Sequence, residues 1–219
     1  MARDRLMRHA KSIQLSQSDK AKEKLGLLVL QKQLQLLRMR EILFIISFVF
    51  AGALGRVLMQ PLPSVEPLTF FAILAGWLFG SRKGFITGAS ALYISNFFMF
   101  GGQGPWTLFQ ALGFGIAGFF GGFLRKKATI LECLMITLIS TLIFEIIMNA
   151  SSLVFLPGSI FTAFLFALPF TIVHIISNVA FSALLPKIKS YIYNKGSFNE
   201  REICREMFNR IKNLGNKEK

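Results

Sequence analysis

Long apolar runs fill the chain between Met39 and Pro186, and only short loops separate them. A run of about 18 or more apolar residues is long enough to cross the hydrocarbon core of a bilayer as a helix. Over the whole chain, 53% of the residues are hydrophobic and only 16% are charged. These features predict an all-α integral membrane protein that crosses the cell membrane several times.

Prolines, glycines and uncharged loops divide the apolar region into predicted helices. Pro61 and Pro63 end the first run, because proline lacks a backbone donor and clashes with the preceding helical turn. A later turn is expected at Pro157-Gly158, a residue pair typical of turns. We predict six spans, at residues 42–59, 67–80, 84–100, 106–124, 128–155 and 160–185.

The basic residues are distributed in a way that predicts the orientation of the chain. Most of the 25 Lys and Arg residues lie before residue 41 or after residue 186. Between these points the Lys and Arg residues are Arg56, the pair Arg82-Lys83 and the cluster Arg125-Lys126-Lys127. Cytoplasmic loops are enriched in Lys and Arg. We therefore predict a compact bundle of six transmembrane helices with both termini in the cytoplasm.

Three regions follow from this distribution. Residues 1–40 are predicted to be a basic cytoplasmic tail with an interfacial helix over 25–40, and residues 41–186 the membrane domain. Residues 187–219 are predicted to be a second basic tail with a short amphipathic helix over 199–213. The net charge of +14 fits contact with anionic lipid. Nucleic acid is not expected as a partner, since basic and aromatic residues do not alternate in the tails.

Polar residues inside predicted spans are costly to bury in lipid, so they mark candidate functional sites. In this chain they are Arg56, Asn96, Gln110, Glu145, Asn149, His174 and Asn178. Glu145 lies well inside the fifth predicted span. We expect its carboxyl group to be protonated, paired with another group, or facing a wet cavity.

Several of these residues are expected to meet in the outer half of the bundle, where external loops add Gln103 and Trp106. Amide groups, a flat indole and one charge suit a small organic solute. We therefore predict a substrate-binding site composed of Arg56, Asn96, Gln103, Trp106, Gln110, Glu145 and Asn149.

Some of these residues also have structural explanations. Arg56 could snorkel to the interface or pair with Glu66. Trp106 could anchor the chain at the membrane surface, and His174 could be a hydrogen-bonded packing residue. A conventional metal site is not expected, because no second His lies in a predicted span. We predict no catalytic residue, metal or cofactor. Cys133 and Cys204 are too few for a disulfide framework.

Small residues recur at spacings of four along several predicted spans. In the first span they are Ser47, Ala51 and Gly55. Helices pack closely in lipid when such residues let their backbones approach. This pattern fits either packing inside the bundle or docking of a partner helix, and the sequence leaves both open.

Five segments of the chain form a recognisable pattern, at residues 55–56, 61–67, 76–84, 95–98 and 102–110, and the string Gly-Gln-Gly-Pro-Trp-Thr at 102–107 is the most specific. Together they resemble the substrate-binding S components of energy-coupling-factor (ECF) transporters, in particular the cobalamin-type branch. The resemblance implies a six-helix bundle that binds a vitamin or related solute at its outer face.

The same resemblance implies partners. They would be a transmembrane coupling subunit, docked through Ser47, Ala51 and Gly55, and two ATP-binding subunits. The chain itself has no Gly-x-x-x-x-Gly-Lys-Ser/Thr phosphate loop, so we do not expect it to power transport.

Three other functions compete with this one. A self-contained small transporter or channel would suit the hydropathy, although no inverted repeat is visible. A rhomboid-like intramembrane serine protease would pair Ser90 with His174, but Ala91 stands where that pattern has glycine. A purely structural membrane protein is the third alternative.

Overall fold

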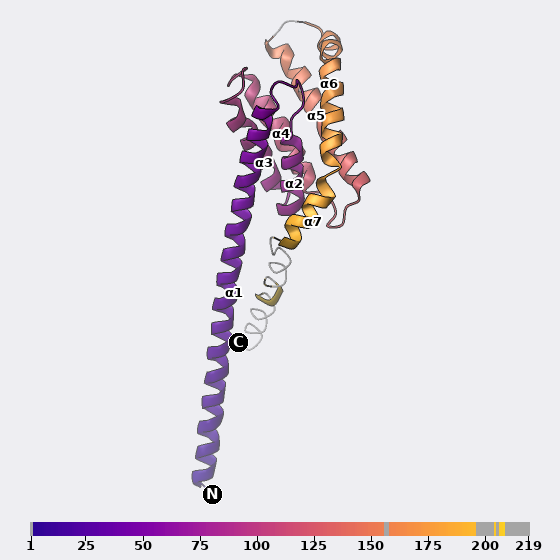
Figure 1. Ribbon diagram of the computed structural model, residues 1–219. Helices are drawn as coiled ribbons and strands as arrows, with labels where there is room; N and C mark the ends of the chain where they lie inside the picture. Colours follow the sequence, from indigo (N-terminus) through magenta and orange to yellow (C-terminus); the bar gives the residue numbers. More distant parts are fainter. Residues whose placement is uncertain (1, 156–157, 196–203, 205, 209–219) are drawn as a thin grey trace. The chain divides into compact units, whose positions relative to one another are not determined.

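The computed structural model describes residues 2–155, 158–195, 204 and 206–208, and these residues form helices and connecting loops without a strand (Figure 1). The helices are α1 (Ala2–Leu58), α2 (Leu68–Phe79), α3 (Ser81–Asn96), α4 (Trp106–Gly121), α5 (Ile130–Phe155), α6 (Ile160–Ser182) and α7 (Leu185–Lys195). The predicted all-α class is therefore confirmed for the described part of the chain.

The chain divides into two compact units, and the cavity described below lies in the larger one. Residues 1–40 and 194–219 make up the smaller unit, and residues 41–193 make up the larger. The predicted helix over 25–40 falls within α1. The predicted helix over 199–213 lies mostly outside the described residues.

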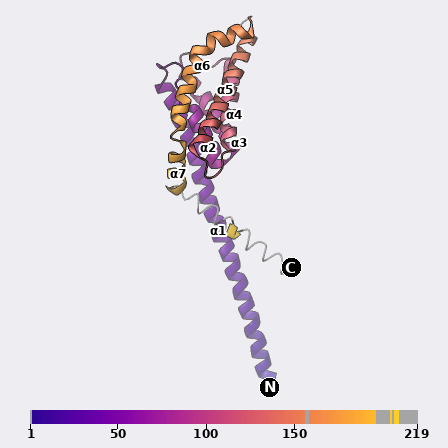
Figure 2. The ribbon, with the colours of Figure 1, turned by 90° about the vertical axis from the view of Figure 1, so that its right-hand side faces the viewer.

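Three short helices form the centre of the larger unit. α2, α3 and α4 pack against one another, α4 also packs against α5, and α5 packs against α6 (Figures 1 and 2). The turn between α2 and α3 is a single residue, Gly80, with a φ of 96°. A residue with a Cβ atom rarely adopts this conformation, so glycine permits the abrupt turn.

Glycines allow α3 and α4 to approach each other until their backbones touch. A Cβ atom added to Gly118 would overlap the carbonyl oxygen of Gly84, and one added to Gly84 would overlap the carbonyl oxygen of Gly118. Gly88 meets the backbone of α4 at Phe114 in the same way. These small residues thus serve packing within the unit, as expected for helices in contact across glycine.

Two clusters of buried side chains form the core of the larger unit. The first contains Phe48, Phe70, Ile73, Leu74, Ala75, Ala117, Leu124, Cys133 and Leu185. The second contains Val49, Leu68, Ala91, Leu92 and Phe114. α2 contributes to both clusters, which explains why a helix of only 12 residues is buried along most of its length. Both cysteines are free, and Cys133 is completely buried.

Three helical segments are long and apolar enough to cross a membrane: Lys24–Leu58, Ile130–Val154 and Ile160–Asn194. The other apolar helices are shorter. α2 has 12 residues and α4 has 16, which corresponds to about 18 and 24 Å of helix, while the hydrocarbon core is about 30 Å thick.

Some predicted helix ends differ from those in the structure. The third predicted span extended to residue 100, but α3 ends at Asn96 and the chain turns through 97–105. The sixth was predicted to end at residue 185, whereas α6 ends at Ser182 and α7 begins at Leu185. Pro186 falls in the first turn of α7, where a backbone N–H would have no helical partner, so proline is tolerated there.

Candidate functional site

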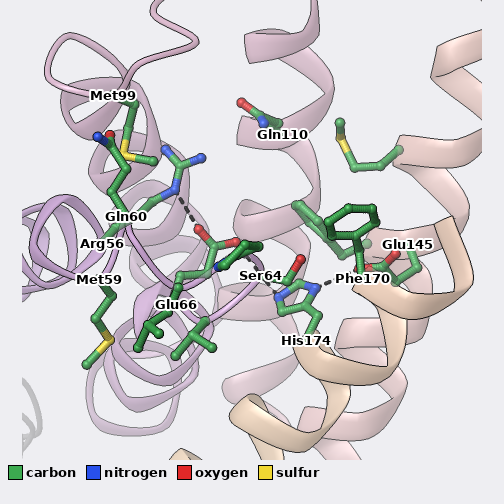
Figure 3. A pocket seen from close by; sticks show the side chains of 15 residues that line it. Arg56, Met59, Gln60, Ser64, Glu66, Met99, Gln110, Glu145, Phe170 and His174 are labelled. Carbon is green, nitrogen blue, oxygen red and sulfur yellow. Dashed lines mark hydrogen bonds and ion pairs between the residues drawn. The ribbon is translucent and has the colours of Figure 1, made fainter.

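A cavity of about 320 Å³ lies among α1, the loop after it, the loop before α4, and helices α4, α5 and α6 (Figure 3). Its lining combines a few charged and amide groups with sulfur-containing and aromatic side chains. The lining residues are Arg56, Met59, Gln60, Leu62, Pro63, Ser64, Val65, Glu66, Met99, Gln110, Phe144, Glu145, Met148, Phe170 and His174.

Arg56, near the end of α1, is held in place by two elements, the loop that carries Glu66 and helix α3. Its Nε donates to Glu66 Oε2 at 2.5 Å. Its Nη1 donates to Ser95 Oγ at 2.9 Å and to Asn96 Oδ1 at 2.5 Å, both on α3. The Arg56 side chain is 9% exposed and that of Glu66 is 14% exposed. A buried charge of this kind is tolerated only when it is paired and hydrogen-bonded.

Asn96 connects Arg56 to α4. Because a guanidinium group only donates, the amide oxygen of Asn96 faces Arg56 and its nitrogen faces α4. Asn96 Nδ2 donates to Thr107 Oγ1 at 3.1 Å and to Gln110 Oε1 at 3.0 Å. Asn96 itself is buried and lies behind the cavity wall, and its amide fixes the orientation of two lining side chains, Arg56 and Gln110.

A second polar group lies across the cavity, between α5 and α6. Glu145 Oε1 is 2.6 Å from His174 Nδ1, and Glu145 Oε2 accepts a hydrogen bond from Thr171 Oγ1 at 2.6 Å. The ring of Phe144 meets the His174 ring edge to face, with centroids 5.2 Å apart. These contacts fix the plane of the imidazole and direct its other nitrogen away from Glu145.

The other ring nitrogen of His174, Nε2, faces the polar group formed by Arg56 and Glu66. His174 Nε2 lies 3.8 Å from Glu66 Oε1 and has no hydrogen-bond partner, although the side chain is only 3% exposed. Figure 3 shows Glu66 between Arg56 and His174. Such an unsatisfied buried atom is uncommon in folded proteins and marks a place where a further group is expected.

The loop that carries Glu66 is ordered by its own backbone. The Leu62 N–H donates to the Met59 carbonyl, and the Val65 N–H donates to that of Leu62. Ser64 has a φ of 59°, which is uncommon for a residue other than glycine. Its carbonyl accepts a hydrogen bond from Ser177 Oγ of α6 at 3.2 Å. The strained residue therefore lies where the loop contacts α6 beside the cavity.

The predicted site residues fall into two groups in the structure. Arg56, Gln110 and Glu145 line the cavity, and Asn96 supports it from behind. The remaining three, Gln103, Trp106 and Asn149, are not among its lining residues.

Each of those three side chains makes a different contact. Gln103 is exposed, and its amide nitrogen donates to the Tyr93 carbonyl at 2.7 Å. Trp106 is 39% exposed and packs over Gly104. Asn149 donates to the carbonyl of Glu145 on its own helix.

Several lining residues were not predicted as substrate-binding residues from the sequence. Glu66 was considered only as a partner for Arg56, and His174 as a packing residue. The sequence signal for Glu66 was its position as the sole acidic residue in the loop after the first span. Met59, Met99 and Met148 carried no such signal, because an apolar side chain in an apolar run does not indicate a cavity.

The lining residues include two carboxylates, Glu66 and Glu145, and one permanent cation, Arg56. Arg56 pairs with Glu66, whereas Glu145 interacts with a hydroxyl group and an imidazole. Within the described part of the chain, no group of three His, Cys, Asp or Glu residues is placed to hold a metal ion. The arrangement is suited to hold a small molecule through hydrogen bonds and charge.

The fold and site thus define a helical protein with long apolar helices and a cavity lined by both polar and apolar side chains. The chain belongs to a family of unknown function, DUF6580, whose family model matches residues 37–197. The match includes every residue that lines the cavity. No curated protein and no solved structure matched the chain.

Proposed function

We propose that the chain is the membrane-embedded substrate-binding subunit of an ECF-type importer. It crosses the cell membrane six times with both termini in the cytoplasm, and it binds a vitamin or related small organic solute. A transmembrane coupling subunit and two ATP-binding subunits then drive delivery of the solute inward. The segments at 55–56, 61–67, 76–84, 95–98 and 102–110 that resemble S components support this proposal.

The cavity is the observation that carries the proposal. Its volume of about 320 Å³ lies near the lower end of the range for small-molecule sites, which is about 300–1,000 Å³. Convergent polar groups beside apolar and aromatic side chains are typical of such sites, and this cavity combines both kinds. A complete corrinoid, with its macrocycle and nucleotide loop, would not be enclosed by this volume. The cavity therefore favours a smaller solute.

The exposed face of α1 supports docking of a partner helix. Ser47 and Ala51 are exposed, four residues apart, beside large exposed apolar side chains such as Phe50. Gly55 has a different environment, since a Cβ atom added there would lie 2.6 Å from Pro67 Cγ. We assign the docking face to Ser47 and Ala51, and Gly55 to packing against the loop.

The contacts of His174 support a binding function over proteolysis. A serine protease needs its serine within hydrogen-bond reach of a base. The ring nitrogens of His174 face Glu145 and Glu66, and no hydrogen bond joins His174 to Ser90 among the described residues.

The proposal is tested by filling the cavity and measuring uptake. Met148→Trp places an indole in the cavity from α5, so uptake of the transported solute by cells should fall at least about tenfold. The control is Ile146→Trp, because Ile146 is exposed on the same helix and does not line the cavity. Tagged chain of both variants should still co-purify with the coupling subunit. Normal uptake by a folded Met148→Trp variant would contradict the proposal.

A further inference from the structure

The charges in the cavity indicate which class of solute it takes. We propose that the solute is an organic cation with an N–H donor, such as a primary ammonium group on an apolar or aromatic body. This inference rests on the proposed function and adds the chemical class of the substrate. It follows from three observations: the charge balance, an unsatisfied pair of acceptors, and the composition of the apolar wall.

The charge balance leaves one carboxylate without a cation. Arg56 is the only permanent cation among the lining residues, and Glu66 already neutralises it. Ser95 and Asn96 occupy its Nη1 atom. Among the described residues, the partners of the Glu145 carboxylate are Thr171 and His174. With a neutral imidazole, the cavity therefore carries a net charge of about −1, and a buried charge favours a partner of opposite sign.

The second observation locates the position of the cation. When His174 Nδ1–H donates to Glu145, Nε2 has only a lone pair and can only accept. It then faces another acceptor, Glu66 Oε1, at a distance of 3.8 Å. Two acceptors at this separation can both be satisfied by one group that donates twice. An ammonium group has three N–H donors and is suited to this position.

The apolar wall would hold the body of such a solute. Met59, Met99 and Met148 bring polarizable sulfur atoms, and Phe144 and Phe170 bring aromatic rings. Aromatic faces attract cations, and thioethers adapt to irregular ligand shapes. An anionic solute is disfavoured, because Glu66 already pairs with Arg56 and the carboxylate of Glu145 would repel the solute's charge.

The alternative is that His174 itself is protonated and supplies the positive charge. An imidazolium would donate to both Glu145 and Glu66 and would neutralise the extra carboxylate. The cavity would then be electrically balanced and would prefer an uncharged solute. The two possibilities make opposite predictions for the binding of matched probes.

The experiment uses three probes with one body: phenethylamine, 2-phenylethanol and 3-phenylpropionate. Each is titrated by calorimetry into the purified full-length chain in detergent. We expect phenethylamine to bind at least about tenfold more tightly than the alcohol, as expected for hydrogen bonds to charged groups. We expect no measurable binding of the carboxylate. Equal or tighter binding of the alcohol or carboxylate, or no binding of any probe, would overturn the assignment.

Variants link the preference to the cavity. Glu145→Gln keeps the shape of the side chain and removes its charge, so the tenfold preference for the amine should disappear. Glu66→Gln should have the same effect and serves if the first variant does not fold. Glu132→Gln is the control, because Glu132 lies on α5 outside the cavity and pairs with Arg125. A preference retained in both cavity variants would place the amine elsewhere.

The outcome is separable from that of the proposed function. If Met148→Trp abolishes uptake but the amine shows no preference, the cavity still binds the solute and only the substrate class is wrong. If Met148→Trp has no effect on uptake, the proposed function itself fails.

Discussion

At the scale of single residues, Asn96 determines how the polar wall of the cavity is arranged. It accepts from Arg56 and donates to Thr107 and Gln110, so one amide joins α1, α3 and α4. Gln103 and Trp106 carry similar chemistry only a few residues away, yet they do not line the cavity. A residue's position in the hydrogen-bond network, rather than its type, therefore decides whether it belongs to the cavity.

Removing this amide should destabilise the fold. Asn96→Ala leaves Arg56 without one acceptor and Gln110 without its donor, so we expect a loss of about 1–3 kcal/mol in the free energy of unfolding. Thermal unfolding of the purified protein in detergent measures this loss. Gln103→Ala removes one exposed hydrogen bond and should change stability by less than about 0.5 kcal/mol. Equal effects of the two substitutions would show that the network does not stabilise the fold.

At the scale of elements, α2, α3 and α4 form a core in which backbones touch. Their glycines bring peptide groups of α3 and α4 into direct contact. α5 and α6 form an antiparallel pair beside this core. Figure 2 shows that α6 is bent. Pro169 lies within α6, and proline removes one helical hydrogen bond, which accounts for such a bend.

A methyl group at the glycine contact should separate α3 from α4. Gly118→Ala places a Cβ atom against the backbone of Gly84, which cannot move as a flexible side chain would. We expect a loss of about 1–3 kcal/mol in stability, typical of overpacking. Gly101→Ala is the control, because nothing lies near the added atom. An unaltered unfolding midpoint for Gly118→Ala would contradict the close contact.

The exposed face of α1 should matter for coupling and not for solute binding. Ala51→Trp adds bulk to the proposed docking face, since close helix contacts require small residues. We expect uptake to be abolished while solute binding to the isolated chain changes less than about twofold. Ile86→Trp, on an exposed position of α3, should leave uptake intact. If Ala51→Trp impairs binding and uptake equally, Ala51 belongs to the internal packing of the bundle.

At the scale of the whole molecule, the distribution of charge sets the proposed orientation. Basic residues flank the apolar region at both ends and form the two clusters at Arg82 and Arg125. The loop residues 60–66 and 101–105 contain no Lys or Arg. This asymmetry is the basis for placing both termini in the cytoplasm.

The two cysteines provide a direct test of orientation. Cys133 is completely buried, so Cys204 is the thiol available to a polar reagent. A membrane-impermeant maleimide should leave intact cells unlabelled and should label Cys204 after permeabilisation. Cys204→Ser should abolish the labelling. Labelling of intact cells would place the C-terminal tail outside.

The sequence was sufficient for the fold class and for most helix boundaries, because apolar runs and turn residues report directly on local structure. It also identified Arg56, Gln110 and Glu145, since polar residues stand out in apolar spans. The sequence was not sufficient to predict that Glu66 and His174 line the cavity together, because they are more than a hundred residues apart in the chain. It also predicted Trp106 in the pocket, although the conformation of the loop before α4 directs this side chain elsewhere.

The cavity wall consists of two hydrogen-bonded halves, which direct packing between α4 and α5 joins on one side, for example at the Phe114 and Phe144 rings. Arg56, Glu66, Asn96 and Gln110 belong to one half, and Glu145, Thr171 and His174 to the other. On the side of the loop, the described link between them is the Ser177–Ser64 hydrogen bond of 3.2 Å, worth about 1 kcal/mol. On this side the loop can therefore separate from α6, between Glu66 and His174, while the hydrogen bonds within each half stay in place. A solute that enters here has this one described hydrogen bond to break.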